Sequence, residues 1–254
     1  MVAAMIFDQF LLATSVLTRL PVAPADAGTE SGEGAIAEAS WAFPAVGAGI
    51  GMIAALVLFV ASSFNIGEGS AALLALVAAG LVTGALHEDG LADTADGFGG
   101  GRTRDDKLAI MRDSRSGTYG VLVLIFSIGL RAGALIAIGS PIDGGLALIA
   151  AHTASRAGLP VVMRWLTPAR ADGLGAMAGM PGPVTTLVAL AIGILVALGM
   201  LGPIRGAVAL VLTGATVVAA ALLARRQIGG YTGDVLGALQ QIGEITMLLV
   251  AAAR

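Results

Sequence analysis

Residues 87–118 read HEDGLADTADGFGGGRTRDDKLAIMRDSRSGT and concentrate charge in a chain that otherwise carries little of it. The whole chain is only 12% charged, whereas globular proteins average about 25%. From Glu88 to Gly101 every charge is acidic, and basic residues follow only from Arg102 onward. A loop that served solubility alone would normally mix the two signs. We therefore expect the chemistry of the protein to lie in this stretch.

Three aspartates of the stretch fall on one face if the segment is helical. At about 100° per residue, Asp89, Asp93 and Asp96 lie within roughly 60° of one another. Like charges at this spacing repel, so a cation is expected among them. Mg²⁺ is usually held by one or two carboxylates together with substrate phosphates. The spacing therefore predicts an Mg²⁺ site on this face, with Gly90 leaving room for a ligand near the backbone.

A basic segment follows the acidic one. Thr103 is a suitable N-cap for a second, short helix, and Asp105 and Asp106 favour its first turn. An acidic metal site beside basic side chains is suited to an anionic phosphate ester. We expect four basic residues to bind the substrate phosphates: Arg102, Lys107, Arg112 and Arg115.

The composition of the chain excludes several other classes of protein. With 254 residues, 57% of them hydrophobic, and a mean hydropathy of +0.91, the chain is an integral membrane protein. A net charge of −3 does not favour nucleic acid as a partner. The absence of cysteine excludes disulfides and thiolate metal sites, and two histidines are too few for a histidine-rich zinc site.

The apolar segments predict an all-α, polytopic membrane helical bundle in a single domain over residues 1–254. About 20 apolar residues are needed to span a bilayer. Residues 5–20 are too short and should form an amphipathic or re-entrant segment, and residues 22–40 a polar connection. About seven spans are expected, at 41–64, 70–86, 119–138, 143–166, 184–204, 206–224 and 235–253.

The distribution of basic residues predicts the orientation of these spans. With the N-terminus inside, nearly all arginines and lysines fall on one side, and only Arg205 and Arg254 fall on the other. We therefore expect a multi-pass protein of the cell inner membrane. Three segments should share its cytoplasmic face: 87–118, 164–183 and 225–234.

The segment RRQIGGYTGD at 225–234 can serve the same site. Glycine-rich turns often bind phosphates through their backbone N–H groups, although many are simple connectors. Because this turn is expected on the same face as the aspartates, we include Thr232 and Asp234 among the candidate substrate-binding residues.

Several polar residues lie within the expected spans. His152 and Arg156 are four residues apart and share one helical face. Charged groups inside a span are expensive, and they mark either a functional site or a buried pair. The sequence does not decide whether these two residues serve a functional site or pair with Glu244 or Asp143. The role of Arg131 is also undecided.

These features allow two classes of function. One is a membrane phosphotransferase that uses Mg²⁺ to bind a diphosphate and basic residues to stabilise the leaving nucleotide. The other is a divalent-cation transporter. A transporter is expected to place its acidic residues near the middle of the bilayer, in broken helices. Because the aspartates are expected at a membrane edge, we favour the enzyme.

Five motifs occur in order along the chain: LTRLP at 17–21, WAFP at 41–44, HEDGLADTADG at 87–97, RDSRSG at 112–117 and GGYTGDVLGA at 229–238. These motifs resemble those of the cobalamin synthase family, the adenosylcobinamide-GDP ribazoletransferases. The resemblance covers essentially the whole chain in order. Glu88 stands where the family pattern is not acidic, so no family role is carried over to it.

The resemblance implies the last step in assembling the nucleotide loop of cobalamin. A hydroxyl of α-ribazole, or of its 5'-phosphate, would attack the diphosphate of adenosylcobinamide-GDP at the phosphorus on the cobinamide side, and GMP would leave. Mg²⁺ would be required, and the lipid bilayer would surround the enzyme. The resemblance does not decide whether the chain forms a homo-oligomer. The CDP-alcohol phosphotransferases are the nearest alternative, but their motif has Ala-Arg where this chain has Leu91 and Ala92.

Combining both lines of reasoning, we expect Asp89, Asp93 and Asp96 to bind Mg²⁺. The base for the attacking hydroxyl is expected to be Asp96, or else Asp113. The expected substrate-binding residues are His87, Arg102, Lys107, Arg112, Arg115, Arg156, Thr232 and Asp234.

Overall fold

The computed structural model describes residues 2–22 and 34–253, and over these ranges the chain forms helices and no strand. The first half contains α1 (Val2–Leu17), α2 (Ala35–Ala39), the 3₁₀ helix η1 (Ser40–Ala42), α3 (Phe43–Ser63), α4 (Glu68–Thr83), α5 (Leu86–Gly100) and α6 (Arg104–Ile110). The second half contains α7 (Thr118–Ile138), α8 (Pro141–Ala157), α9 (Leu159–Trp165), α10 (Leu174–Met177), α11 (Pro183–Leu201), α12 (Pro203–Ile228) and α13 (Gly233–Ala252).

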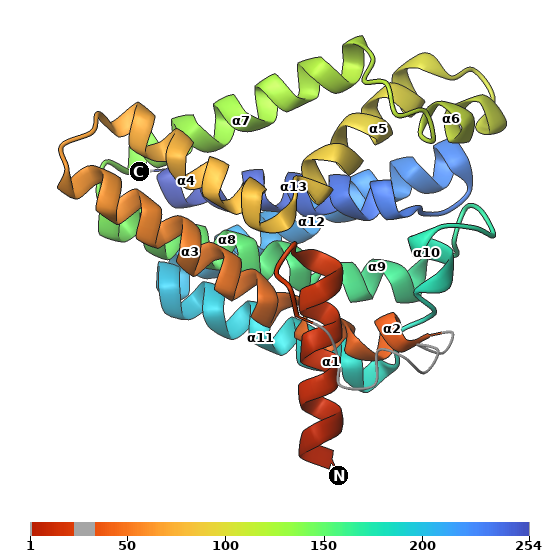
Figure 1. Ribbon diagram of the computed structural model, residues 1–254, viewed down its shortest axis with the longest axis horizontal. Helices are drawn as coiled ribbons and strands as arrows, with labels where there is room; N and C mark the ends of the chain where they lie inside the picture. The colour runs from red at the N-terminus through yellow and green to blue at the C-terminus, as the bar shows by residue number, and fades with distance from the viewer. Residues whose placement is uncertain (1, 23–33, 254) are drawn as a thin grey trace.

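The long helices run roughly along one direction, so the chain turns at two opposite ends of the bundle (Figure 1). At the end drawn on the left, the chain turns between α3 and α4, between α7 and α8, and between α11 and α12. At the end drawn on the right lie α6, α10 and the turn between α12 and α13. The charged stretch therefore belongs to one end of the molecule.

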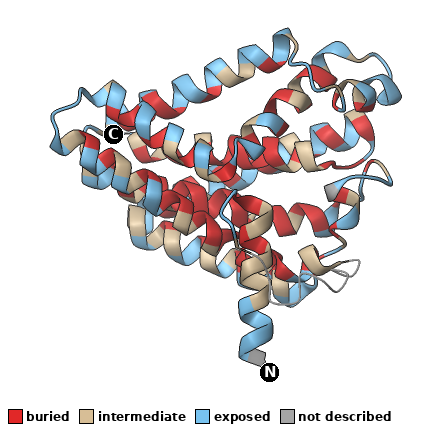
Figure 2. Cartoon of the chain, viewed as in Figure 1, coloured by how far each residue is buried: buried red, intermediate tan, exposed pale blue. Residues whose placement is uncertain are grey.

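Among the described residues, six helical segments are long and apolar enough to cross a membrane, and α4 and α5 together make a seventh candidate. The buried surface gathers on the central helices α8 and α13, whereas the outer helices expose many apolar side chains (Figure 2). Leu56, Phe126 and Val211 are examples of large side chains that face outward. This pattern confirms the predicted all-α, multi-pass membrane bundle. The six segments are 35–63, 118–138, 141–165, 183–201, 203–228 and 233–252.

The expected second span at 70–86 corresponds to α4, but the chain bends sharply just before its expected end. Helix α4 ends at Thr83, and α5 leaves it at an angle of 90°. Gly84 and Ala85 both have positive φ, at 63° and 56°, a conformation that breaks a right-handed helix. A β-carbon at Gly84 would collide with the side chain of Arg19, which explains why glycine occupies the bend.

Helix α5 is therefore the second half of a broken helix that packs against α13 and α7. The acidic residues lie on this packed helix, as their helical spacing predicted. The argument against a transporter relied on aspartates that lie at a membrane edge and outside broken helices, and the break before α5 removes the second of these two grounds.

Helix α1 is too short to span a bilayer, in agreement with its expected role as a short N-terminal segment. It runs across the direction of the bundle helices (Figure 1), and its second half packs on α2 and α3. The indole N–H of Trp41 donates a hydrogen bond of 2.8 Å to Gln9. Of the predicted polar connection, residues 23–33 lie outside the described ranges, whereas α2 and η1 make the part from Ala35 onward helical.

Small residues bring the central helices into close contact. A β-carbon at Gly51 of α3 would lie 2.7 Å from the Cα of Ile149 on α8, and one at Gly193 of α11 would lie 2.5 Å from the Cβ of Ala157. Both distances are too short for a real contact, so larger residues would push the helices apart. Such small-residue interfaces are typical of membrane helices, which gain their stability from close packing.

Candidate active site

The three segments that were predicted to share one face do meet in the structure. The N–H of Ala169 donates to the carbonyl of Tyr231 at 2.7 Å, and the N–H of Tyr231 donates to the carbonyl of Thr167 at 3.0 Å. A β-carbon at Gly230 would collide with Thr167, so only glycine permits this approach. The segment after α9 and the turn before α13 are thereby joined.

Basic side chains of helix α6 donate hydrogen bonds to the segment after α9 and to the end of α12, just before the turn that leads to α13. Thr103 caps the helix as predicted, because its hydroxyl accepts the N–H of Asp106 at 3.1 Å and the Asp106 carboxylate accepts the N–H of Thr103 at 3.0 Å. Arg104 donates to the carbonyl of Ile228 at 2.9 Å and also to the carbonyl of Ala169. The sequence analysis did not single out Arg104.

Lys107 also makes a contact of this kind. Its ammonium donates to the side chain of Gln227, at the end of α12. We expected Lys107 to bind substrate, and the structure places it beside the site but in contact with a protein partner.

An acidic cluster forms where α5 crosses the start of α13. Asp93 lies within electrostatic reach of Asp89 and Asp234, and Asp89 also acts on Asp234. The two helices approach closely because a β-carbon at Gly90 would lie 2.7 Å from the backbone oxygen of Asp234. Gly90 therefore serves this crossing, and not a ligand as predicted. We call Asp89, Asp93 and Asp234 the acidic cluster.

One arginine accompanies the acidic cluster. Arg170, from the segment after α9, places its Nη2 3.4 Å from Asp234 Oδ2. Its buried Nη1 has no hydrogen-bond partner among the described residues. Thr232 caps α13 by accepting the N–H of Val235 at 3.2 Å, and its hydroxyl donates to Asp234 at 3.1 Å. Thr232 and Asp234 thus lie at the cluster, whereas Arg170 was missed in the sequence because a lone arginine in a loop carries no motif.

Asp96 shares the helix face of Asp89 and Asp93 but is directed to a different partner. Its carboxylate accepts the backbone N–H groups of Gly117 at 2.6 Å and Gly120 at 2.9 Å, and so caps the start of α7. A β-carbon at Gly117 would lie 2.5 Å from the carboxylate, which requires glycine at that position. Residues more than twenty positions away in the sequence therefore occupy both oxygens of Asp96.

Two expected phosphate-binding arginines lie in exposed ion pairs. Arg112 is 2.6 Å from Asp172, and Arg115 is 2.7 Å from Asp113. Exposed pairs of this kind contribute little to stability, so a substrate phosphate can replace the carboxylates at little cost. The side chain of Arg102 is exposed and makes no hydrogen bond with the part of the chain that the structure describes.

The surroundings of Asp113 bear on its expected role as a base. Hydrogen bonds from the side chain and the backbone N–H of Arg115 lower the pKa of Asp113 from 3.8 to about 2. A carboxylate that holds its charge so firmly takes up a proton poorly.

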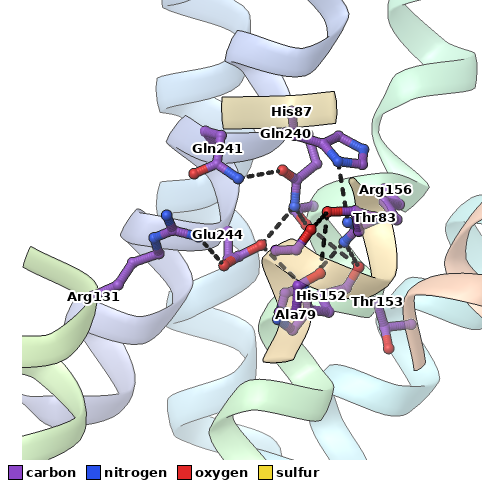
Figure 3. A network of polar contacts seen from close by, with 12 residues as sticks. Ala79, Thr83, His87, Arg131, His152, Thr153, Arg156, Gln240, Gln241 and Glu244 are labelled. Atoms are coloured by element: carbon purple, nitrogen blue, oxygen red, sulfur yellow. Dashed lines mark hydrogen bonds and ion pairs between the residues drawn. The ribbon is translucent and has the colours of Figure 1, made fainter. Parts of the chain in front are cut away.

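His87 and Arg156 are buried in a polar network at the centre of the bundle (Figure 3). Arg156 lies 3.5 Å from His87 Nδ1 and donates to the carbonyl of His152 at 3.0 Å. His152 Nδ1 lies 3.0 Å from Glu244. Of the two pairings left open for His152, the structure contains the one with Glu244.

Arg131 extends the network toward α5. Its Nη1 lies 2.9 Å from Glu244 and 3.2 Å from Glu88, which also accepts a hydrogen bond from Gln241 at 3.2 Å. Glu88 therefore turns into the bundle, whereas Asp89 next to it belongs to the acidic cluster. The network joins the middle of the bundle to the helix that carries the cluster.

A cleft of about 200 Å³ opens beside the acidic cluster. Its walls come from α1, α3, α5, α9 and α13, with further residues from α2 and α10. Most of the lining is apolar, and its charged or ionisable side chains are His87, Asp89, Arg170 and Asp234.

Comparison with known proteins gives the family. The family model described as cobalamin-5-phosphate synthase matches residues 9–252. The chain belongs to this family. The sequence-based prediction of the cobalamin synthase family is thereby confirmed.

Similar members of the family have been named in several bacteria. A protein from Bradyrhizobium diazoefficiens named adenosylcobinamide-GDP ribazoletransferase is 53% identical over 242 residues, which cover 95% of this chain and 92% of the relative. A protein of the same name from Mesorhizobium japonicum is 45% identical over 247 residues, covering 97% and 93%. One from Sinorhizobium medicae is 42% identical over 252 residues, covering 95% of each. No solved structure was found to match the chain.

The acidic cluster of this family member fits Mg²⁺ in the type of its donor atoms. Carboxylate oxygens are hard ligands, and Mg²⁺ needs only one or two of them when substrate phosphates supply the rest. Within the described ranges, no three His, Asp or Glu side chains are arranged to hold a metal ion by themselves. The cluster is therefore suited to an ion that is shared with a diphosphate.

Proposed function

We propose that this chain transfers the adenosylcobinamide phosphate group of adenosylcobinamide-GDP to α-ribazole or its 5'-phosphate and releases GMP. The product is adenosylcobalamin or its 5'-phosphate, and the reaction closes the nucleotide loop. The names of relatives up to 53% identical over nearly the whole chain support this activity. The observation in the structure that carries it is the acidic cluster, which lies at the end of the bundle that also bears the weakly paired arginines.

The reaction needs one bond to form and one to break. A ribose hydroxyl oxygen forms a bond to the phosphorus on the cobinamide side of the diphosphate. The bond from this phosphorus to the bridging oxygen breaks, and GMP leaves with that oxygen. The hydroxyl proton passes to a carboxylate at the site. Positioning and neutralisation of charge dominate such phosphoryl transfers.

We assign Asp89 and Asp93 to hold Mg²⁺, with Asp234 beside them. A bound Mg²⁺ would neutralise diphosphate charge and polarise the phosphorus under attack. The place of Asp96 among the ligands stays a prediction, because its oxygens already accept two backbone N–H groups. For the base we favour a carboxylate of α5 over Asp113, whose pKa of about 2 makes it a weak base.

Arg112, Arg115 and Arg102 are proposed to bind the diphosphate and the leaving GMP. The support is their position and their exposure, with Arg112 and Arg115 held only in exposed ion pairs. The bias of basic residues to this end of the bundle supports a site on the cytoplasmic face of the inner membrane.

The test is GMP release by the purified protein in detergent, given adenosylcobinamide-GDP and α-ribazole, with Mg²⁺ or with EDTA. Release that requires both substrates and stops with EDTA is expected. Folded protein that releases no GMP would reject the proposal. The next experiment would then supply CDP-alcohol donors, and after them divalent cations in a transport assay.

A further inference from the structure

We propose that the cleft beside the acidic cluster binds the acceptor nucleoside, with its flat apolar base inside and its ribose toward Asp89 and Asp234. This inference rests on the proposed function, and it assigns to one of the two substrates a place that the motifs do not indicate. Three properties of the cleft carry it: its size, the chemistry of its lining and its position.

The size of the cleft excludes the corrinoid ring. A volume of about 200 Å³ is below the roughly 300–1,000 Å³ of pockets for drug-sized ligands, so the cleft suits only a small molecule. A corrinoid ring with its amide side chains is several times larger and would have to lie outside. By size, the cleft can hold a nucleoside, so either the acceptor or the guanosine part of the donor could enter it.

The lining selects an apolar base. Leu17, Phe43, Leu159 and Met163 contribute to the wall, and each of them is almost fully buried. A guanine in this wall would leave its donors and acceptors without partners, which is unfavourable for buried polar groups. The dimethylbenzimidazole of α-ribazole carries methyl groups where guanine carries polar ones. The wall therefore discriminates against the donor nucleotide.

The polar side chains of the cleft are those that a ribose requires. Asp89 and Asp234 belong both to the lining and to the acidic cluster. A ribose hydroxyl placed beside them is close to the carboxylates that are proposed to hold the metal and take the proton. Arg170 lines the same cleft, and its Nη1 has no partner among the described residues. This donor is suited to a ribose oxygen or to a 5'-phosphate.

The cleft also explains the position of α1. Val16 and Leu17 from the end of this helix line the cleft together with residues of α9 and α13. A helix that lies across the bundle can thereby close one side of a site whose chemistry comes from α5.

The test is a substitution that fills the cleft without disturbing the core. Leu86 lines the cleft and is 37% exposed, so Leu86→Trp can be accommodated. Leu74→Trp is the matched control, because Leu74 is 42% exposed on α4 and does not line the cleft. We expect Leu86→Trp to raise KM for α-ribazole roughly 10-fold or more and to leave KM for adenosylcobinamide-GDP unchanged. The control should change neither value.

A second variant enlarges the cleft, whereas Leu86→Trp fills it. Met163→Ala removes apolar contact from the cleft, and Met247→Ala removes a methionine that is equally buried on α13 away from it. Only Met163→Ala should weaken the binding of α-ribazole and so raise its KM. Unchanged KM values in both cleft variants, or an equal rise for both substrates, would overturn the inference while GMP release continues.

Direct binding separates this inference from the proposed function. Equilibrium dialysis of α-ribazole against the protein in detergent needs no turnover. If the unsubstituted protein binds α-ribazole and Leu86→Trp weakens this binding, the assignment of the acceptor to the cleft is supported even if no GMP is released. If GMP is released but the two proteins bind α-ribazole equally, the function stands and the cleft assignment is wrong.

Discussion

The guanidinium of Arg170 lies 3.4 Å from the carboxylate of Asp234 and joins the segment after α9 to the first turn of α13. The two residues are 64 positions apart in the sequence, and nothing in either motif predicts the contact. Asp234 belongs to the acidic cluster, so Arg170 is the cation that offsets part of its charge. Arg170 also lines the cleft.

We predict that Arg170→Met discriminates between the two forms of the acceptor. A charge-assisted hydrogen bond contributes about 1.5–3 kcal/mol. KM should therefore rise roughly 10-fold or more for α-ribazole 5'-phosphate and less for α-ribazole. Steady-state GMP release with each acceptor measures this difference. Arg205→Met, at the opposite end of the bundle, is the control. Equal effects of Arg170→Met on both acceptors would contradict a contact between Arg170 and the 5'-phosphate.

We predict that Asp93→Asn abolishes turnover and leaves the protein folded. The loss should exceed the roughly 10²- to 10⁴-fold that a general base contributes, because a metal ligand supports both binding and chemistry. GMP release across a titration of Mg²⁺ measures it. Asp143→Asn is the control, since Asp143 is an exposed aspartate far from the cluster. Activity of Asp93→Asn equal to that of the unsubstituted protein would sink the metal assignment.

We predict that Asp96→Ala loosens the start of α7. Removing a capping side chain costs about 0.5–2 kcal/mol, and here the amides of Gly117 and Gly120 both lose their acceptor. Hydrogen exchange at these two amides should accelerate. Asp96→Asn keeps one acceptor oxygen and should show a smaller change. If exchange is unchanged in Asp96→Ala, the cap does not stabilise this helix in solution.

Arg115→Ala should raise KM for adenosylcobinamide-GDP and leave KM for α-ribazole unchanged. Arg115 is exposed and pairs with Asp113, so the substitution removes a phosphate contact without disturbing the bundle. Kinetics at varied donor concentration measure this effect. An unchanged donor KM would exclude Arg115 from the diphosphate site.

The lowered pKa of Asp113 leads to a pH prediction. Its folded-state pKa of about 2 is below the ordinary value of 3.8, so any stabilisation by the pair with Arg115 is present above the ordinary value and lost as the pH falls toward 2. Nothing from Asp113 titrates near neutrality. The pH profile of Asp113→Asn should therefore match that of the unsubstituted protein above about pH 5. If Asp113→Asn lost the pH-dependent rise in activity that the unsubstituted protein shows, Asp113 would be the base after all.

We predict a large loss of stability in Arg131→Met. Removing one partner of a buried ion pair costs roughly 3–5 kcal/mol, and here Glu244 would remain buried without this cation. Thermal unfolding in detergent should occur at a clearly lower temperature. Glu88→Gln should have a smaller effect, because the Glu88 side chain is 19% exposed and that of Glu244 is fully buried. Equal effects of the two substitutions would contradict this account.

Local patterns in the sequence predicted much of this molecule. The lengths of the apolar segments, the cap at Thr103 and the helical face of Asp89 and Asp93 follow from the geometry of a single helix. The bias of basic residues correctly placed three distant segments at one end of the bundle, since membrane helices alternate in direction. The motifs correctly predicted the family.

Contacts between distant segments could not be predicted in this way. Helical spacing placed Asp96 on the face of Asp89 and Asp93, but close packing at Gly117 and Gly120 turned its carboxylate to α7. The same kind of packing brought Asp234 to α5.

The bend at Gly84 and Ala85, the pairing of Glu88 with Arg131 and the cleft also depend on how the helices pack. Helical period and hydropathy are properties of neighbouring residues, so they determine which helices form and which face of each is polar. Close contacts between small residues then determine which faces meet, and those contacts assemble the site.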